Sequence, residues 1–238
     1  MLVLLVVPLE QLLFKHSHQL EHGFVQLMLH QLNILWLLVV DLVVNGLVVE
    51  EVLDRKVNPG IVRQLNGLGC KARGISGRQV FHARKAPKAD GVDLGRVGEV
   101  ERCSVETVRK CLETKETAVV SPAGQGNDGG AMNLNADVAA AALAGALGAE
   151  QLVFLSDVPG LMRDPKDAAT LIREIRSEEL VKLENEGVIS GGMIPKCRSA
   201  AAALRQGLRR VEFVDGRVAG NLTAVVKGQA VAGTVLKG

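Results

Sequence analysis

The segment Ser190-Gly191-Gly192-Met193-Ile194-Pro195-Lys196 joins a glycine turn to a predicted helix start and sets one lysine in the first helical turn. Pro195 suits the entry of a helix over 196–207. The N–H groups and positive dipole end of such a helix attract anions, and glycines leave room for them. Lys196 would add a full charge where charge develops during phosphoryl transfer. The alternative is a glycine cap on the preceding helix, followed by a lysine on a solvated face.

A second polar group, Asn133, Asn135 and Asp137, leads into an alanine-rich helix predicted over 138–147. Asparagine offers donors and acceptors that suit a substrate carboxylate or amide, and Asp137 could hydrogen-bond catalytic lysines. The alternatives are that the asparagines bond their own backbone and that Asp137 caps the helix. Both interpretations stay open at this point.

The third candidate is Asp157, which follows an apolar strand predicted over 151–155. Strand, loop, helix and strand in this order form the unit of a parallel sheet, whose ligands gather at the carboxyl ends of the strands. Asp157 could hold a nucleotide ribose or a metal-bound water, or it could cap its own turn. The chain has no GxxxxGK[ST] loop and no kinase glycine-rich loop. Ser121 lacks a GxSxG context, which disfavours a serine hydrolase.

The remaining elements are predicted from apolar periodicity and from Gly and Pro signals. We expect a helix over 48–65 with a break or turn at Pro59, and a helix over 104–112 with Ser104 as its N-cap. The other expected elements are a strand over 70–76, a polar loop or hairpin over 78–90, a strand or hairpin edge over 92–100, a buried strand over 118–122, a glycine-rich loop over 124–130, a hairpin or loop over 163–167, a helix over 177–186, and strands over 211–214 and 232–236.

Composition limits the class of protein. The 238 residues are 47% apolar with a net charge of +2, and the charges are interspersed, so no nucleic-acid footprint is present. Cys70, Cys103, Cys111 and Cys197 form no CxxC pair, which is typical of reduced thiols in a cytoplasmic protein.

The first 45 residues differ in texture from the rest, since Leu, Val, Gln and His dominate there. The apolar run over 34–49 contains Asp41 and Asn45 and is shorter than the roughly 20 residues that span a bilayer, so we expect no membrane segment. Residues 1–13 lack the basic region of a signal peptide. The histidines of this segment lack an acidic partner, so no metal site is predicted: His16, His18, His22 and His30.

Seven segments in order make the chain from about Val48 to Gly238 similar to the amino acid kinase superfamily, and within it to the acetylglutamate kinases of arginine biosynthesis. Any single segment is weak evidence, but seven in the same order are specific. They are Lys56-Val57-Asn58, Gly74-Ile75-Ser76-Gly77, Asp93-Leu94-Gly95-Arg96-Val97-Gly98-Glu99-Val100, Asn133 to Asp137, Leu155 to Gly160, Gly187 to Lys196 and Asp215-Gly216-Arg217-Val218.

The resemblance implies an α/β protein, a three-layer αβα sandwich with a central mainly parallel sheet. It implies ATP and Mg²⁺ as cofactors and phosphorylation of the side-chain carboxylate of N-acetyl-L-glutamate. By the same resemblance Lys196 stabilises the transferring phosphoryl group, Asp137 holds the catalytic lysines, and Asn133 binds substrate, with Asn135 beside it. It also implies a homodimer or higher homo-oligomer. The nucleotide-binding residues are then Asp157, Val158, Pro159, Gly160, Leu161, Met162, Val188, Ile189, Ser190, Gly191 and Gly192.

The chain departs from the family pattern before Val48. The family has a first catalytic lysine after a glycine-bearing strand, a His-Gly-Gly-Gly phosphate loop and a substrate arginine in a Leu-Arg-Val-Thr-Asp segment, and none of these occurs in residues 1–47. We therefore expect residues 1–45 to be an atypical segment, from a replaced or wrongly translated start, and residues 46–238 to form the kinase-like domain. The alternatives are a non-catalytic module that still binds nucleotide, and an acetylaminoadipate kinase, which differs in substrate length.

Overall fold

The structure is a computed structural model that describes residues 4–6, 50–88 and 93–238. These residues divide into two compact units, Met1–Ala139 and Ala140–Gly238. The predicted domain boundary near residue 45 and the four N-terminal histidines lie outside the described residues, so those predictions stay predictions. Within the described ranges, no helix has the length and apolar character that crossing a bilayer requires.

The described part of the first unit contains short strands and helices. In chain order its elements are β1 (Leu4–Val6), the π-helix η1 (Glu50–Val57), α4 (Asn58–Gly67), β2 (Ala72–Ile75), the 3₁₀ turn η2 (Gly77–Gln79), β3 (Phe81–Lys85), β4 (Val97–Cys103), α5 (Glu106–Glu113), β5 (Thr117–Val120), β6 (Ala123–Gly126) and β7 (Ala131–Leu134).

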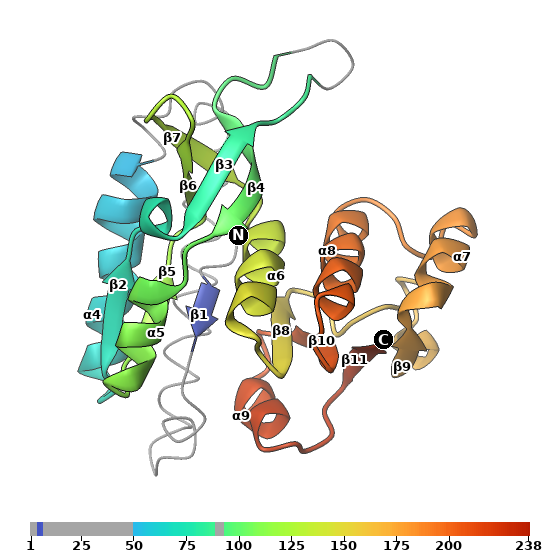
Figure 1. Cartoon of the computed structure of the whole chain (residues 1–238). Helices are drawn as coiled ribbons and strands as arrows, with labels where there is room; N and C mark the ends of the chain where they lie inside the picture. Colours follow the sequence, from blue (N-terminus) through green and yellow to red (C-terminus); the bar gives the residue numbers. More distant parts are fainter. Residues whose placement is uncertain (1–3, 7–49, 89–92) are drawn as a thin grey trace. The chain divides into compact units, whose positions relative to one another are not determined.

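A three-stranded sheet, ordered β1-β5-β2, forms one layer of this unit. β5 runs parallel to β2, with Ile75 opposite Val120, and antiparallel to β1. Every residue of β5 is buried, as the predicted apolar strand requires. α4 packs beside β2, and the two are neighbours in Figure 1.

The predicted helix over 48–65 is confirmed from Glu50 onward, with a change of helix type inside it. η1 has π geometry up to Val57, and α4 begins with Asn58 and Pro59. Proline has no N–H group and fits the first turn of an α-helix, which is why the change falls there. The predicted break at Pro59 is therefore a junction between two helical segments.

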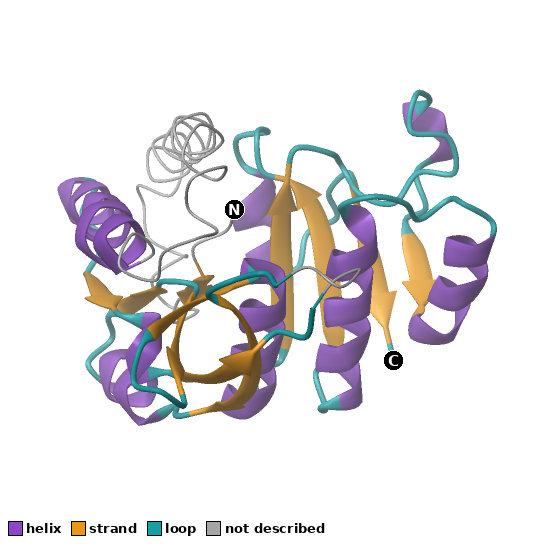
Figure 2. Cartoon of the chain, turned by 90° about the horizontal axis from the view of Figure 1, so that it is seen from above, coloured by secondary structure: helices purple, strands orange, loops and turns teal. Residues whose placement is uncertain are grey.

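A segment predicted as a loop or hairpin and one predicted as a loop contribute strands to a four-stranded closed barrel, β3-β4-β7-β6, which Figure 2 shows end-on as an orange ring. The antiparallel pairing of β3 with β4 confirms the hairpin alternative predicted over 78–90, but this strand is not polar throughout, because Phe81 and Ala83 are fully buried. The glycine-rich loop over 124–130 begins as β6. A Cβ on Gly124 would lie 2.9 Å from the Cβ of Ala83, so this glycine allows close strand packing inside the barrel.

The predicted N-cap Ser104 was also wrong. α5 begins at Glu106, its N-cap is Val105, and no side chain caps it. The Ser104 hydroxyl instead lies 2.9 Å from Nε2 of His82 on β3. The Ser104 hydroxyl, which local propensity predicts as a helix cap, therefore makes a long-range contact with β3 instead.

The second unit follows the predicted alternation of strands and helices. Its elements are the greater part of α6 (Ala136–Leu147), β8 (Gln151–Ser156), η3 (Ala168–Thr170), β9 (Glu174–Arg176), η4 (Ser177–Glu179), α7 (Leu180–Asn185), α8 (Met193–Arg205), β10 (Arg210–Asp215), α9 (Asn221–Val226) and β11 (Gly233–Lys237).

Its sheet has the order β8-β10-β11-β9. β8 and β10 are parallel, as are β11 and β9, while β10 and β11 are antiparallel. α8 packs on β10 and β11, and Phe154, Phe213 and Leu236 are fully buried. Both units thus combine helices with parallel-rich sheets, which confirms the predicted α/β class.

Candidate functional site

The glycine turn and the lysine belong to the second unit. α8 begins at Met193 with Gly192 as its N-cap, so the helix starts three residues before the predicted position. The N–H groups of Met193 and Ile194 donate to the carbonyls of Ser190 and Gly191, at 3.1 and 3.2 Å, and Pro195 has no N–H. These N–H groups are therefore not free for an anion, contrary to expectation, but Lys196 does lie in the first turn.

The two glycines of this turn differ in whether their backbone conformation requires a glycine. Gly191 has a φ of +53°, a left-handed conformation that favours glycine. Gly192 has a φ of −65°, which any residue adopts, and a Cβ there would meet no heavy atom within 4 Å. Neither backbone conformation nor packing requires glycine at 192, so the open space beside it is available to a ligand.

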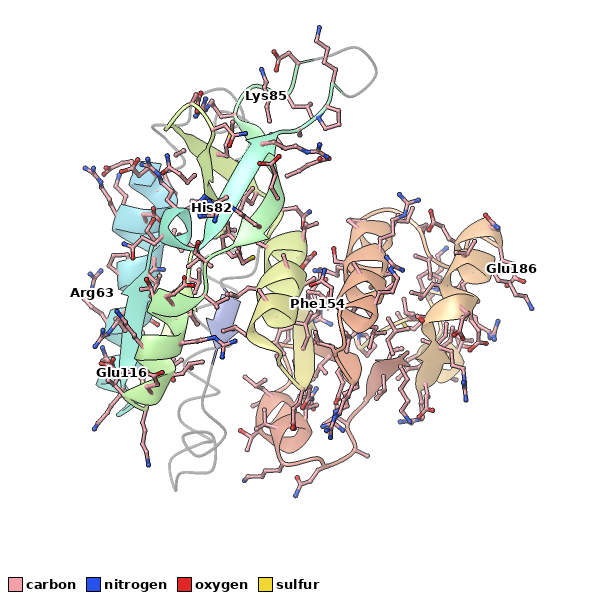
Figure 3. The ribbon with its side chains drawn as sticks, viewed as in Figure 1. Arg63, His82, Lys85, Glu116, Phe154 and Glu186 are labelled. Carbon is pink, nitrogen blue, oxygen red and sulfur yellow. The ribbon has the colours of Figure 1, made fainter. Side chains whose placement is uncertain are left out.

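Lys196 projects over the aromatic centre of the sheet. Its Nζ lies 5.7 Å from the centroid of the Phe154 ring on β8, which is labelled in Figure 3. Phe154 stacks on Phe213 of β10, with 5.6 Å between ring centroids. A lysine ammonium at this distance from a ring face is attracted by the ring quadrupole. The structure therefore sets the ammonium above β8, the strand that leads directly into Asp157.

The turn after β8 is fixed by a neighbouring strand. A Cβ on Gly160 would lie 2.4 Å from Thr234 Oγ1, so the backbone can approach β11 here only without a side chain. The N–H of Leu161 donates to the same hydroxyl at 2.8 Å, and Met162 forms a bridge with Leu171. Asp157, at the other end of the turn, is exposed. The predicted nucleotide turn is thus rigid at Gly160–Met162 and open at Asp157.

The segment before the glycine turn closes α7. The N–H groups of Val188 and Ile189 both donate to the carbonyl of Leu183, at 3.0 and 3.1 Å, and Ile189 is buried. Ser190 and Gly191, which follow, are exposed. Of the predicted nucleotide residues, Ile189 and Leu161 therefore serve the core, and only their backbones could face a ligand.

Sequence reasoning gave no role to Asp215 and Arg217, although their segment contributed to the resemblance. Asp215 ends β10 directly opposite Ser156 of β8, and the Arg217 guanidinium forms two hydrogen bonds to its carboxylate, at 3.0 and 2.8 Å. Arg217 lowers the pKa of the Asp215 carboxyl below its ordinary value. This ion pair lies where the parallel strands end, which is the place expected of a ligand site.

The first unit holds Asn133, Asn135 and Asp137. Asn133 lies on β7 opposite Ala123, and its N–H donates to the carbonyl of Arg96 at 2.7 Å. Asn135 Oδ1 accepts from the N–H groups of Asp137 and Val138, at 2.9 and 3.1 Å. Asn135 is therefore the residue that caps α6, and Asp137 lies in the first turn. The side-chain carbonyl oxygen of Asn135 is thus used by backbone N–H groups of α6. Substrate binding by Asn133 and Asn135 stays a prediction.

A polar stripe on η1 and α4, which sequence reasoning missed, supports the carboxyl ends of β2 and β5. We define it as Glu50, Asp54 and Asn58, which recur every four residues. Asp54 accepts hydrogen bonds from the hydroxyls of Ser76, at 2.5 Å, and of Ser121. Asn58 Nδ2 donates to the Val119 carbonyl at 2.8 Å. The four-residue spacing is itself a signal, since such residues share a helix face.

Glu50, the third member of the polar stripe, pairs with Arg78 at 2.5 Å. Arg78 also donates to Gln125 Oε1 on β6 and to the Gly129 carbonyl, both at 3.0 Å. Its side chain therefore ties η1 to the β6–β7 hairpin that carries Asn133. From the other side, Arg96 holds Asp128 in the same hairpin turn and lowers the pKa of that carboxyl to about 2.

The sequence profile of the amino acid kinase family matches residues 15–215, so the match begins inside the segment that was predicted to be atypical. The chain is 42% identical to an acetylglutamate kinase of Akkermansia muciniphila over 72% of this chain and 59% of that protein. It is 37% identical to an acetylglutamate kinase of Clostridioides difficile over 80% of this chain and 66% of that protein. The chain thus spans about three fifths to two thirds of the length of these relatives.

Among solved structures, the chain is similar to N-acetylglutamate synthase of Neisseria gonorrhoeae complexed with coenzyme A and N-acetyl-glutamate. The TM-score is 0.67 at 26% identity, covering 76% of this chain and 41% of the synthase. This structural similarity supports the α/β fold described above.

Proposed function

Because this chain belongs to the amino acid kinase family, we propose that it transfers the γ-phosphoryl group of ATP to the side-chain carboxylate of N-acetyl-L-glutamate. The two acetylglutamate kinases, at 42% and 37% identity, support this choice of acceptor. Assembly into a homodimer or higher homo-oligomer, and residence in the cytoplasm, remain predictions that accompany the proposal.

The observation that carries the proposal is the position of Lys196. Its ammonium lies above Phe154 of β8, in the first turn of a helix that a glycine turn precedes. In this proposal Lys196 offsets the negative charge that spreads over the equatorial oxygens of the transferring phosphoryl group. By the family resemblance, Asp137 would hold the catalytic lysines, and Asn133 would bind the acceptor through its side-chain amide.

The second unit offers the chemistry that ATP needs. The open space beside Gly192 and the exposed Ser190–Gly191 backbone suit a phosphate chain, and Asp157 suits ribose hydroxyls. Mg²⁺ takes most of its ligands from phosphates and water, with one or two carboxylates, so it needs no preformed cage of protein ligands. Bound with ATP, it would neutralise charge on the phosphate oxygens.

We expect turnover to be slow. Removal of one donor to a developing charge typically costs about 10²–10³ in rate. Residues 1–47 lack the lysine, the glycine loop and the arginine of the family pattern. This observation favours the second candidate, a non-catalytic module of the same fold that binds nucleotide.

Release of ADP in a coupled assay, with ATP, Mg²⁺ and N-acetyl-L-glutamate, tests the proposal. We expect measurable turnover in the full chain and a loss of about 10²–10³ in Lys196→Ala. Lys182→Ala, which removes an exposed lysine of α7, is the matched control and should retain the rate. N-acetyl-L-aminoadipate as acceptor tests the substrate-length alternative.

Calorimetric titration with ATP and Mg²⁺ separates the candidates where turnover is absent. Nucleotide binding without ADP release would support the non-catalytic module. A chain that neither binds ATP nor releases ADP would refute both candidates.

A further inference from the structure

The carboxyl ends of β8 and β10 are joined by a direct backbone contact. Ser156 and Asp215 are the last residues of the two parallel strands and lie opposite each other. The N–H of Gly216 donates to the Ser156 carbonyl at 2.8 Å. The loop after β10 therefore begins against the strand that carries the proposed nucleotide turn.

Asp215 holds the Arg217 side chain in one orientation. Its Oδ1 accepts from Nε of Arg217 at 3.0 Å and its Oδ2 from Nη2 at 2.8 Å, while the N–H of Arg217 donates to Oδ1 at 2.9 Å. Asp215 is 8% exposed, whereas the Arg217 side chain is 50% exposed. Asp157 also contributes to raising the pKa of Arg217 above its ordinary value.

The alternation of side chains along a strand places this pair on a defined face of the sheet. Asp215 follows Phe213 by two residues, so both side chains emerge on the same face. Phe213 stacks on Phe154, and the Lys196 ammonium lies over Phe154. Lys196 and the Asp215–Arg217 pair therefore share one face of the sheet, near the carboxyl ends of β8 and β10.

We propose that Arg217 is a second cationic contact, beside Lys196, for the phosphate chain of the nucleotide. The inference rests on the proposed function and names a residue for it. Two of the five N–H donors of the guanidinium engage Asp215, and the exposed remainder can bind phosphate oxygens in the forked geometry that arginine favours. The buried Asp215 carboxylate holds the Arg217 guanidinium in one orientation before the nucleotide binds, which lowers the side-chain entropy lost on binding.

Calorimetric titration of the full chain with ATP, ADP and adenosine tests this contact. In Arg217→Gln we expect affinity for ATP and ADP to fall at least about tenfold and affinity for adenosine to stay unchanged, because adenosine has no phosphate. Arg217→Lys, which keeps the charge but loses the fork, should fall less. Arg173→Gln, which removes an exposed arginine just before β9, is the matched control.

The melting temperature of each variant shows whether it is folded. Arg217→Gln with wild-type affinity for ATP would overturn the contact and leave the proposed function intact. An equal loss for ATP and adenosine would also overturn it, because the phosphates would not be what Arg217 recognises. A wild-type chain that binds none of the three ligands would reject the proposed function together with the contact.

Discussion

Gly160 and Gly192 differ in the space that surrounds them, and this space shows whether the fold requires a glycine. At Gly160 a neighbouring strand occupies the space that a side chain would need, with the Thr234 backbone nitrogen 2.9 Å from a Cβ. At Gly192 that space is open. A glycine that the fold itself does not require suggests a requirement imposed by a ligand.

Substitution by alanine should therefore affect mainly the stability of the protein at Gly160 and mainly ATP binding at Gly192. We expect Gly160→Ala to destabilise the protein by about 1–3 kcal/mol through overpacking against β11. Gly192→Ala should change the free energy of unfolding by less than about 0.5 kcal/mol but weaken ATP binding. Urea unfolding and calorimetric titration measure the two quantities. Unchanged ATP affinity in a folded Gly192→Ala variant would show that this space does not receive the nucleotide.

At the scale of elements, the polar stripe of Glu50, Asp54 and Asn58 joins η1 and α4 to the ends of two parallel strands. The central member is the most consequential, because Ser121 is 1% exposed and donates its hydroxyl to Asp54. A buried hydroxyl that loses its acceptor is costly. The stripe therefore explains how a π-helix stays docked on the sheet.

Asp54→Ala should lower the free energy of unfolding by about 1–3 kcal/mol, because it removes the acceptor for two hydroxyls. Glu51→Ala is the matched control, since Glu51 is exposed and its ion pairs, at 3.6 and 4.0 Å, are long. Urea unfolding should show little change for the control. If both variants unfold at the same urea concentration, the stripe does not contribute to stability.

For the molecule as a whole, arginine–aspartate pairs make the free energy of unfolding depend on pH in the acidic range. Arg96 holds Asp128 in the first unit and Arg217 holds Asp215 in the second, and each arginine lowers the pKa of its partner. A carboxyl whose pKa is lower in the folded state contributes stability above its unfolded value, near 3.9. That contribution is lost as the pH falls through the folded pKa.

Asp215→Asn should therefore lower the melting temperature at pH 7 and reduce the further loss between about pH 4 and pH 2. Asp128→Asn should change the acid limb less, because solvent screens that exposed pair. Thermal scans at pH 7, pH 4 and pH 2 measure the melting temperatures of the wild type and the two variants. Because the chain has two compact units, a scan can contain two transitions. The same acid loss in wild type and Asp215→Asn would exclude this pair as its source.

The sequence by itself determined what local pattern controls. The apolar run of β5, the alanine-rich α6 and the proline at the start of α4 could be predicted because each depends on neighbouring residues. The ordered segments also predicted the family, since they need only be present in order. The roles assigned to Lys196, Asp137 and Asn133 stay predictions.

The tertiary structure alone decided which distant residues meet. Asp54 and Ser121 are 67 residues apart, and Leu161 and Thr234 are 73 apart, so no local periodicity connects them. β6 was mistaken for a loop because its glycines signal a turn locally, whereas in the fold they admit the side chains of neighbouring barrel strands. Likewise, Arg217 became a candidate only when β10 paired with β8 and placed it beside the proposed nucleotide turn.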